Sequence, residues 1–229
     1  MKICGIQKLT LLDYPEKTAC TIFTGGCNFR CPFCHNADLV VGSEPDGIPE
    51  EEILTFLKKR QGILEGVCIT GGEPLLWSDI GEFIRKVKEL GFSVKLDTNG
   101  SRPELLKELA GSGLIDYVAM DIKNSLEGYP ETVGIDGFDT QDIQNSVKFL
   151  MESGIDYEFR TTVVEEFHTE ERIRELAEWI KGAKRYFLQN FKETERVIQK
   201  GLHSVGEEQM KAFAETAKKY IEKVELRGI

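Results

Sequence analysis

The stretch TACTIFTGGCNFRCPFCHN, residues 18–36, joins a predicted strand to three closely spaced cysteines. Its first six residues, TACTIF, are apolar and rich in β-branched side chains, which is typical of a buried strand. Cys27, Cys31 and Cys34 follow at C-x3-C-x2-C spacing and make up half of the six cysteines in the chain. The stretch therefore predicts a strand that ends in a metal-binding or redox loop.

Five further apolar runs are predicted to be strands, at residues 66–70, 92–97, 117–122, 157–164 and 186–191. Amphipathic segments with helical spacing lie between or after them, at residues 77–91, 101–113, 140–154, 169–182 and 207–223. Strands that alternate with helices indicate right-handed βαβ units and a parallel sheet. About six units fall short of the eight that close a barrel. The predicted fold class is therefore α/β, a partial, open (β/α)6 TIM-like barrel with a mostly parallel sheet.

We expect a single domain over residues 1–229, with the N-terminal segment 1–17 packing on the barrel. The longest irregular stretch, residues 40–52, is predicted to be an exposed loop. The net charge of −10 argues against a nucleic-acid partner, which needs basic patches to meet phosphate. No apolar run reaches the roughly 20 residues of a membrane span, and the N-terminus lacks a signal-peptide pattern. We therefore expect a cytoplasmic protein without a membrane partner.

Six cysteines are too few for a disulfide scaffold in a chain of 229 residues. Cys4, Cys20 and Cys68 are scattered among apolar residues, and we interpret them as small core residues. The three clustered thiols suit soft metals. A structural zinc ion would need a fourth ligand from His35 or elsewhere. A structural zinc site at the three cysteines remains an alternative.

An iron–sulfur cluster is the interpretation that we favour for the three clustered cysteines. A 4Fe–4S cluster is normally held by four cysteines, so three leave one iron with an open position. An open position is useful when a substrate or cofactor must chelate the cluster. The spacing alone thus favours one 4Fe–4S cluster with an open iron over a zinc or purely structural site.

Several motifs resemble those of the radical S-adenosylmethionine (SAM) enzymes. GCNFRCPFCHN (26–36) resembles their cluster loop, and ITGGEPLL (69–76) resembles their glycine-rich second motif. KLDTNG (95–100) and AMDIK (119–123) resemble strand ends of the activase subgroup. The whole chain, from LLDYP to ELRGI, is similar to anaerobic ribonucleoside-triphosphate reductase activating proteins, which are relatives of the pyruvate formate-lyase activating enzyme. Those proteins carry glycine after DYP, whereas Glu16 stands here, and we expect a local effect on turn geometry.

The resemblance implies that Cys27, Cys31 and Cys34 hold one 4Fe–4S cluster, whose open iron is chelated by SAM. The reduced cluster would cleave SAM to methionine and a 5′-deoxyadenosyl radical, which would take hydrogen from a backbone glycine of a partner enzyme. The implied partner is a glycyl radical enzyme, most simply anaerobic ribonucleotide reductase, with a low-potential electron donor such as flavodoxin or ferredoxin. Beyond the cluster and its cofactor, no catalytic side chain is expected.

Active sites of parallel α/β barrels lie at the C-terminal ends of the strands, where the motif residues are predicted. Gly71 and Gly72 would let the backbone approach the methionyl amine. Asp97 and Asp121 would bind the ammonium, the ribose or a monovalent cation, and Lys123 would pair with the cofactor carboxylate. The implied cofactor-binding residues are Phe33, His35, Gly71, Gly72, Glu73, Asp97, Thr98, Asn99, Asp121, Lys123, Arg160 and Gln189.

Each of these residues also has an ordinary structural interpretation. The two glycines also suit a strand-to-helix turn, and the aspartates also suit helix capping. His35 could be a hydrogen-bonded loop histidine rather than a neighbour of the adenine. Arg160 needs a partner if it is buried, and an internal salt bridge would serve as well as cofactor ribose or a partner-protein group. His168 and His203 lie in acidic, polar segments, and we assign them no catalytic role.

Two other functions remain open from the sequence. The first is a small-molecule radical SAM enzyme of the deazaguanine-synthase type, in which residues 40–52 would act as a lid. The second is a non-catalytic iron–sulfur protein, which would not need the GGE and DTNG motifs. The chain has little beyond the predicted barrel, so its mouth should stay open to a protein loop, which favours the activase.

Overall fold

The computed structural model describes residues 1–40 and 47–229. Eight strands form one sheet in the order β1 to β8, so each strand neighbours the next along the chain. β1 (Ile3–Thr10) runs antiparallel to β2 (Ala19–Thr24), whereas β2, β3 (Gly66–Gly71) and β4 (Ser93–Thr98) are parallel. Over the described residues the order begins at β1 and ends at β8 without closing. The predicted α/β class with a mostly parallel, open sheet is therefore confirmed.

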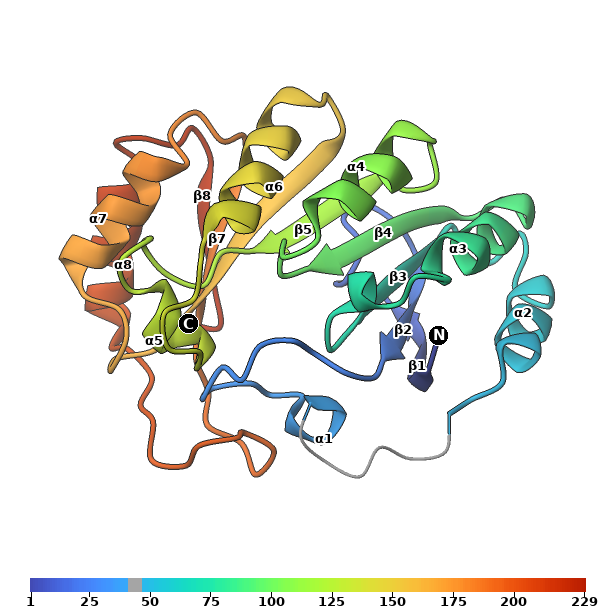
Figure 1. The fold of residues 1–229 in the computed structure, drawn as a ribbon, viewed down its shortest axis with the longest axis horizontal. Helices are drawn as coiled ribbons and strands as arrows, with labels where there is room; N and C mark the ends of the chain where they lie inside the picture. Colours follow the sequence, from blue (N-terminus) through green and yellow to red (C-terminus); the bar gives the residue numbers. More distant parts are fainter. Residues whose placement is uncertain (41–46) are drawn as a thin grey trace. The chain divides into compact units, whose positions relative to one another are not determined.

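The first of two compact units comprises residues 1–28, 38–98 and 102–119. Its strands β2 and β3 carry no charged residue along their length, and Ile22, Ile69 and Leu96 are fully buried. Such continuous apolar strands are typical of a parallel sheet that helices cover. The helical elements of this unit are α2 (Glu50–Lys58), the 3₁₀ helix η1 (Pro74–Leu76), α3 (Ile80–Glu89) and α4 (Pro103–Gly111), and the short helix α1 (Ala37–Val40) begins just before residue 38 (Figure 1).

The second unit comprises residues 29–37, 99–101 and 120–229. Strand β5 (Tyr117–Asp121) starts in the first unit and ends in the second. Helices α7 and α8 lie side by side in this unit (Figure 1). None of the helices in the described part of the chain is long and apolar enough to cross a membrane. The remaining elements are α5 (Tyr129–Val133), α6 (Gln141–Glu152), β6 (Asp156–Val163), α7 (Glu170–Trp179), β7 (Tyr186–Asn190), α8 (Glu207–Ala217) and β8 (Val224–Arg227), with β6, β7 and β8 parallel.

The six predicted strands are confirmed as β2 to β7, and the five predicted helices as α3, α4, α6, α7 and α8. Two strands were missed by the sequence reasoning. β1 forms from the predicted N-terminal segment, but its central residues are only partly buried, so it has no continuous apolar run. β8 has only four residues, which is too short for a periodic pattern.

The prediction of a loop over residues 40–52 is wrong at both ends. Val40 belongs to α1, and α2 begins at Glu50. Residues 41–46 lie outside the described residues. The sequence signal for α2 was present, because Pro49 precedes three glutamates in the first turn and the buried Ile53 and Leu57 are four residues apart.

The turn after the DYP motif shows the expected effect of Glu16. Glu16 has a φ of 62°, and it is the one non-glycine residue with positive φ among the described residues. The left-handed conformation costs a non-glycine residue about 1–2 kcal/mol. Glycine would remove this cost. Its greater freedom in the unfolded chain would lower the free energy of unfolding by about 0.5–1 kcal/mol and so cancel part of the gain.

We therefore expect Glu16→Gly to raise the free energy of unfolding by about 0.5–1 kcal/mol, measured by denaturant titration. Glu108→Gly, in the interior of α4, is the matched control and should lower stability by about 1 kcal/mol. A loss of stability in Glu16→Gly would contradict the strained turn.

Candidate active site

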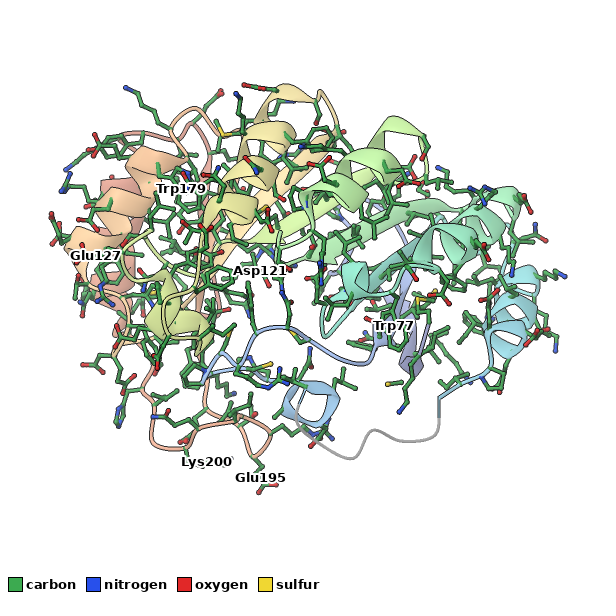
Figure 2. The ribbon with its side chains drawn as sticks, in the orientation of Figure 1. Trp77, Asp121, Glu127, Trp179, Glu195 and Lys200 are labelled. Atoms are coloured by element: carbon green, nitrogen blue, oxygen red, sulfur yellow. The ribbon has the colours of Figure 1, made fainter. Side chains whose placement is uncertain are left out.

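In the first unit, the turn between β2 and Cys27 is held by backbone hydrogen bonds. Gly26 has a φ of 81°, and its amide donates to the Leu39 carbonyl at 2.8 Å. The indole of Trp77 donates from Nε1 to the Gly25 carbonyl at 2.9 Å (Figure 2 labels Trp77). Glycine fits this turn because it has no Cβ and tolerates positive φ. The path of the chain into Cys27 is therefore well fixed.

Gly71 and Gly72 pack directly against this turn. The Gly72 amide donates to the Thr24 carbonyl at 2.9 Å, and the Glu73 amide donates to the Gly26 carbonyl at 2.8 Å. A Cβ on Gly72 would lie 2.6 Å from the Gly26 carbonyl carbon and would overlap its oxygen. A Cβ on Gly71, whose φ is 120°, would overlap the Thr24 backbone. The glycines thus let two backbones meet, and they position the turn that leads to Cys27.

Glu73 is fully buried, and its carboxylate has partners within the same unit. Its Oε1 accepts hydrogen bonds from the Leu75 amide at 3.0 Å and from Thr98 Oγ1 at 2.8 Å. The first bond caps η1, and the second joins the end of β3 to the end of β4. Glu73 and Thr98 are therefore built into the support of the strand ends.

Asp97 pairs with a buried lysine that the sequence reasoning did not single out. Lys95 Nζ donates to Asp97 Oδ1, and it also lies 3.8 Å from Cys68 Sγ. Cys68 Sγ is in turn 3.7 Å from Asp97 Oδ1. Cys68 is buried, as predicted, but it contacts charged groups rather than only apolar ones. The alternation of charge in KLD, with Lys95 and Asp97 two residues apart on one strand face, was the available signal.

In the second unit, Asp121, Lys123 and Arg160 form a cluster with one carboxylate between two cations (Figure 2 labels Asp121). Arg160 Nε lies 2.9 Å from Asp121 Oδ1, and Lys123 Nζ lies 3.0 Å from Oδ2. The Asp121 side chain is 33% exposed. Burial alone would raise the pKa of Asp121, but the charges of Arg160 and Lys123 outweigh it and hold this pKa well below its usual value. The cluster therefore carries a net positive charge.

Lys123 also interacts electrostatically with the cysteine loop of this unit. Burial disfavours its ammonium, but the charges of Asp121 and of the Cys31 thiolate raise the pKa of Lys123 above its ordinary value. Burial raises the pKa of the Cys34 thiol, and a backbone hydrogen bond at Asn36 and the Lys123 charge offset only part of this effect. A cation beside these sulfurs suits thiolate ligands, because metal binding requires the deprotonated form.

Aromatic contacts anchor the residues on either side of Cys34. The Phe33 ring lies 5.9 Å from the Phe167 ring, centroid to centroid. The His35 ring stacks on Phe191 at 5.4 Å, and its Nε2 donates to the Lys192 carbonyl at 2.8 Å. His35 thus has a hydrogen-bond partner and a ring partner within this unit, and a place beside the adenine stays a prediction.

The segment of residues 191–206 holds the cysteine loop from a second direction. The Gln199 amide donates to the Pro32 carbonyl at 2.8 Å. Asn190 closes the base of the segment, because its side chain exchanges hydrogen bonds of 2.8 and 3.0 Å with the Val205 backbone. Gln189, one residue earlier, has an exposed side chain. The neighbouring Asn190, rather than Gln189, thus has the visible positioning role.

Two histidines without a predicted catalytic role lie in different settings. His168 is buried, which lowers its pKa, and its Nε2 donates to the Lys123 carbonyl at 2.9 Å. It therefore supports the backbone of the DIK motif. His203 is exposed and pairs with Glu166 at 2.7 Å, and this contact raises the pKa of His203.

The structure thus joins some predicted residues directly and gives others local roles. Asp121, Lys123 and Arg160 come together, as do Glu73 and Thr98. The Asn99 carboxamide oxygen accepts from the Ser101 amide at 2.9 Å and shapes the turn after β4.

The described residues contain no group of three His, Cys, Asp or Glu side chains arranged for a single metal ion. A four-iron cluster does not need its ligands to converge on one ion, because each cysteine binds a different iron. Cluster binding by Cys27, Cys31 and Cys34 therefore stays a prediction.

Comparisons with known proteins found matches over most of the chain. The sequence profile of the Radical SAM superfamily matches residues 21–180. A protein of Methanocaldococcus jannaschii, named provisionally as a glycyl-radical enzyme activating enzyme, is 35% identical over 234 residues, which cover 99% of this chain and 96% of the relative.

Two solved structures show the same fold. Streptococcus suis SuiB superposes with a TM-score of 0.71 at 18% identity, over 91% of this chain and 48% of that chain. A domain of a pyruvate-formate lyase-activating enzyme from Bacteroides vulgatus superposes with a TM-score of 0.58 at 18% identity, over 71% of this chain and 99% of that chain.

Proposed function

Because the chain belongs to the radical SAM superfamily, we propose that it is an activase that generates a glycyl radical on a partner glycyl radical enzyme. Members of this superfamily use a 4Fe–4S cluster and SAM, and the chain is an enzyme of this radical chemistry. The observation that carries the activase proposal is the similarity to the M. jannaschii protein, which runs along almost the whole length of both chains. We propose that residues 1–229 act together as one radical SAM domain.

In this proposal Cys27, Cys31 and Cys34 hold the cluster. The donor set fits, because three thiolates leave one iron free to accept another ligand. The Lys123 ammonium interacts electrostatically with Cys31 and offsets part of the negative charge that the thiolates bring. When bound and reduced, the cluster supplies the electron that cleaves SAM into methionine and a 5′-deoxyadenosyl radical.

The three charged residues Asp121, Lys123 and Arg160 are the proposed site for the carboxylate of SAM. Two cations share one carboxylate, so a net positive charge remains for an anionic ligand. The cations are partly buried, and such groups interact more strongly with a ligand than surface charges do. Asp121 holds both cations in place and restricts their motion.

We expect Lys123→Met and Arg160→Met each to raise the dissociation constant of SAM by about tenfold, which is typical for the loss of one charged hydrogen bond. Anaerobic calorimetry on reconstituted protein with equal iron content measures this constant. Arg174→Met, which removes surface pairs with Glu171 and Glu178, is the control and should bind SAM as the wild type does. Unchanged SAM affinity in both test variants would show that Asp121, Lys123 and Arg160 form only an internal salt bridge.

The remaining residues are proposed to frame the cofactor. Phe33 and His35 would lie beside the adenine in orientations that Phe167 and Phe191 fix. Asp97 would meet the polar groups of SAM from the end of β4. A monovalent cation at the aspartates is not part of this proposal, because Asp97 and Asp121 each already pair with a cationic side chain of the chain.

We propose anaerobic ribonucleoside-triphosphate reductase as the partner and a low-potential flavodoxin or ferredoxin as the electron donor. The support is the resemblance of the LLDYP, KLDTNG and ELRGI segments to the activating proteins of that reductase. The test mixes reduced, reconstituted protein and SAM with each glycyl radical enzyme of the source organism. A glycyl radical in the electron paramagnetic resonance spectrum of the reductase is the expected result. SAM cleavage without a radical on any of these enzymes would favour the small-molecule alternative.

A further inference from the structure

Lys95 is a buried cation next to a predicted cofactor residue. Its side chain is only 2% exposed, and that of Asp97 is 14% exposed. Both side chains leave the same face of β4, since residues two apart on a strand share a face. In the sheet register Lys95 lies opposite Cys68, which lies opposite Thr21 of β2. The ammonium therefore sits in a row of small polar groups inside the first unit.

Burial of this pair needs an explanation beyond stability. Lysine is almost never fully buried unless it is paired. A buried ion pair is weak support for stability, because removing two charges from water offsets most of their attraction. The Asp97 carboxylate ends β4, where the active sites of parallel barrels lie. A role for the pair in holding this carboxylate is thus more consistent with the structure than a purely stabilising role.

We propose that Lys95 is a positioning residue for Asp97, whose carboxylate it orients and neutralises in place of a dissolved monovalent cation. The inference rests on the proposed function, since it assigns Asp97 to the SAM site. Its basis is the direct contact between Lys95 Nζ and Asp97 Oδ1, with Cys68 Sγ within 4 Å of both atoms. A tethered ammonium is present at high effective concentration, so salt in the medium should not be needed.

One property of the wild type follows from this role. SAM affinity should be the same in buffers whose cation is sodium, potassium or tetramethylammonium at equal ionic strength. The last cation is too bulky to replace a buried metal ion. A site that depends on a dissolved cation would instead lose affinity in tetramethylammonium.

The test is chemical rescue of Lys95→Ala, followed by SAM binding rather than turnover. The substitution removes the equivalent of n-propylammonium, so we expect affinity for SAM to fall about tenfold or more, as when an outer partner of a ligand is lost. Millimolar n-propylammonium should restore most of the affinity, and sodium or potassium should restore part of it. The neutral n-propanol should not. Lys86→Ala, which removes an exposed lysine paired with Glu50, is the control.

The outcomes separate the two proposals. Wild-type protein that neither binds nor cleaves SAM would overturn the proposed function and this inference together. Wild-type binding with an unchanged affinity in Lys95→Ala would overturn the inference alone. So would a loss that n-propylammonium and n-propanol restore equally, because the ammonium charge would then be irrelevant. If Lys95→Ala unfolds, Lys95→Met keeps the volume, and its SAM affinity should gain a dependence on sodium or potassium that the wild type lacks.

Discussion

Replacing any one of Cys27, Cys31 and Cys34 by alanine is expected to abolish the iron–sulfur cluster. The wild type should bind about four irons per chain, and the variants should lose the visible absorption of the cluster with nearly all of this iron. The physical reason is that three thiolates already leave one iron open, so a second missing ligand leaves the cluster without adequate support. Iron analysis and absorption spectroscopy after anaerobic reconstitution measure the effect.

Cys20→Ala is the matched control for the three variants. Burial raises the pKa of Cys20 to about 12, so its thiol stays protonated and makes a poor metal ligand. Its replacement should leave the iron content unchanged. Cluster loss in Cys20→Ala, or an intact cluster in Cys31→Ala, would contradict the assignment of the ligands.

Gly72→Ala is expected to disrupt the turn that leads to Cys27. The new Cβ would overlap the Gly26 carbonyl, and both partners are backbone in a tightly bonded turn. The two turns must move apart to remove this overlap. We therefore expect the free energy of unfolding to fall by about 3 kcal/mol, at the upper end of overpacking effects. Thermal or denaturant unfolding measures this loss, and iron content should fall with it.

Gly111→Ala provides the control for this change. Gly111 lies in the last turn of α4, and a Cβ there would meet nothing within 4 Å. Alanine should therefore raise stability by about 0.5–1 kcal/mol, because glycine has a poor helix propensity. A Gly72→Ala variant as stable as Gly111→Ala would show that the two turns do not constrain each other.

The sequence predicted the parallel strands because each is a short apolar run, and periodicity reports such runs directly. It missed β1 because an edge strand with partly exposed residues lacks that pattern, and it missed α2, whose first turn lies within the irregular stretch 40–52. Glu16 shows a different kind of success, since one departure from a motif located a residue with positive φ.

The sequence names the candidate site residues but not the contacts between them. Asp121 and Arg160 lie 39 positions apart in the sequence, and only the fold shows that the Asp121 carboxylate joins Arg160 and Lys123. Lys95 and Asn190 received no role from the sequence, because a lysine in a strand and an asparagine at a strand end have ordinary interpretations. Their importance follows from burial and from hydrogen-bond partners, which depend on tertiary packing.

The most direct test of the activase proposal follows hydrogen from the partner to the cofactor. The anaerobic reductase is prepared with deuterium on the α-carbon of its radical-bearing glycine, and it is mixed with reduced protein and SAM. The proposal predicts that deuterium appears in the released 5′-deoxyadenosine, and that it is absent when this glycine is replaced by alanine. Cleavage of SAM without deuterium transfer from the reductase or from any other glycyl radical enzyme of the source organism would contradict the activase function.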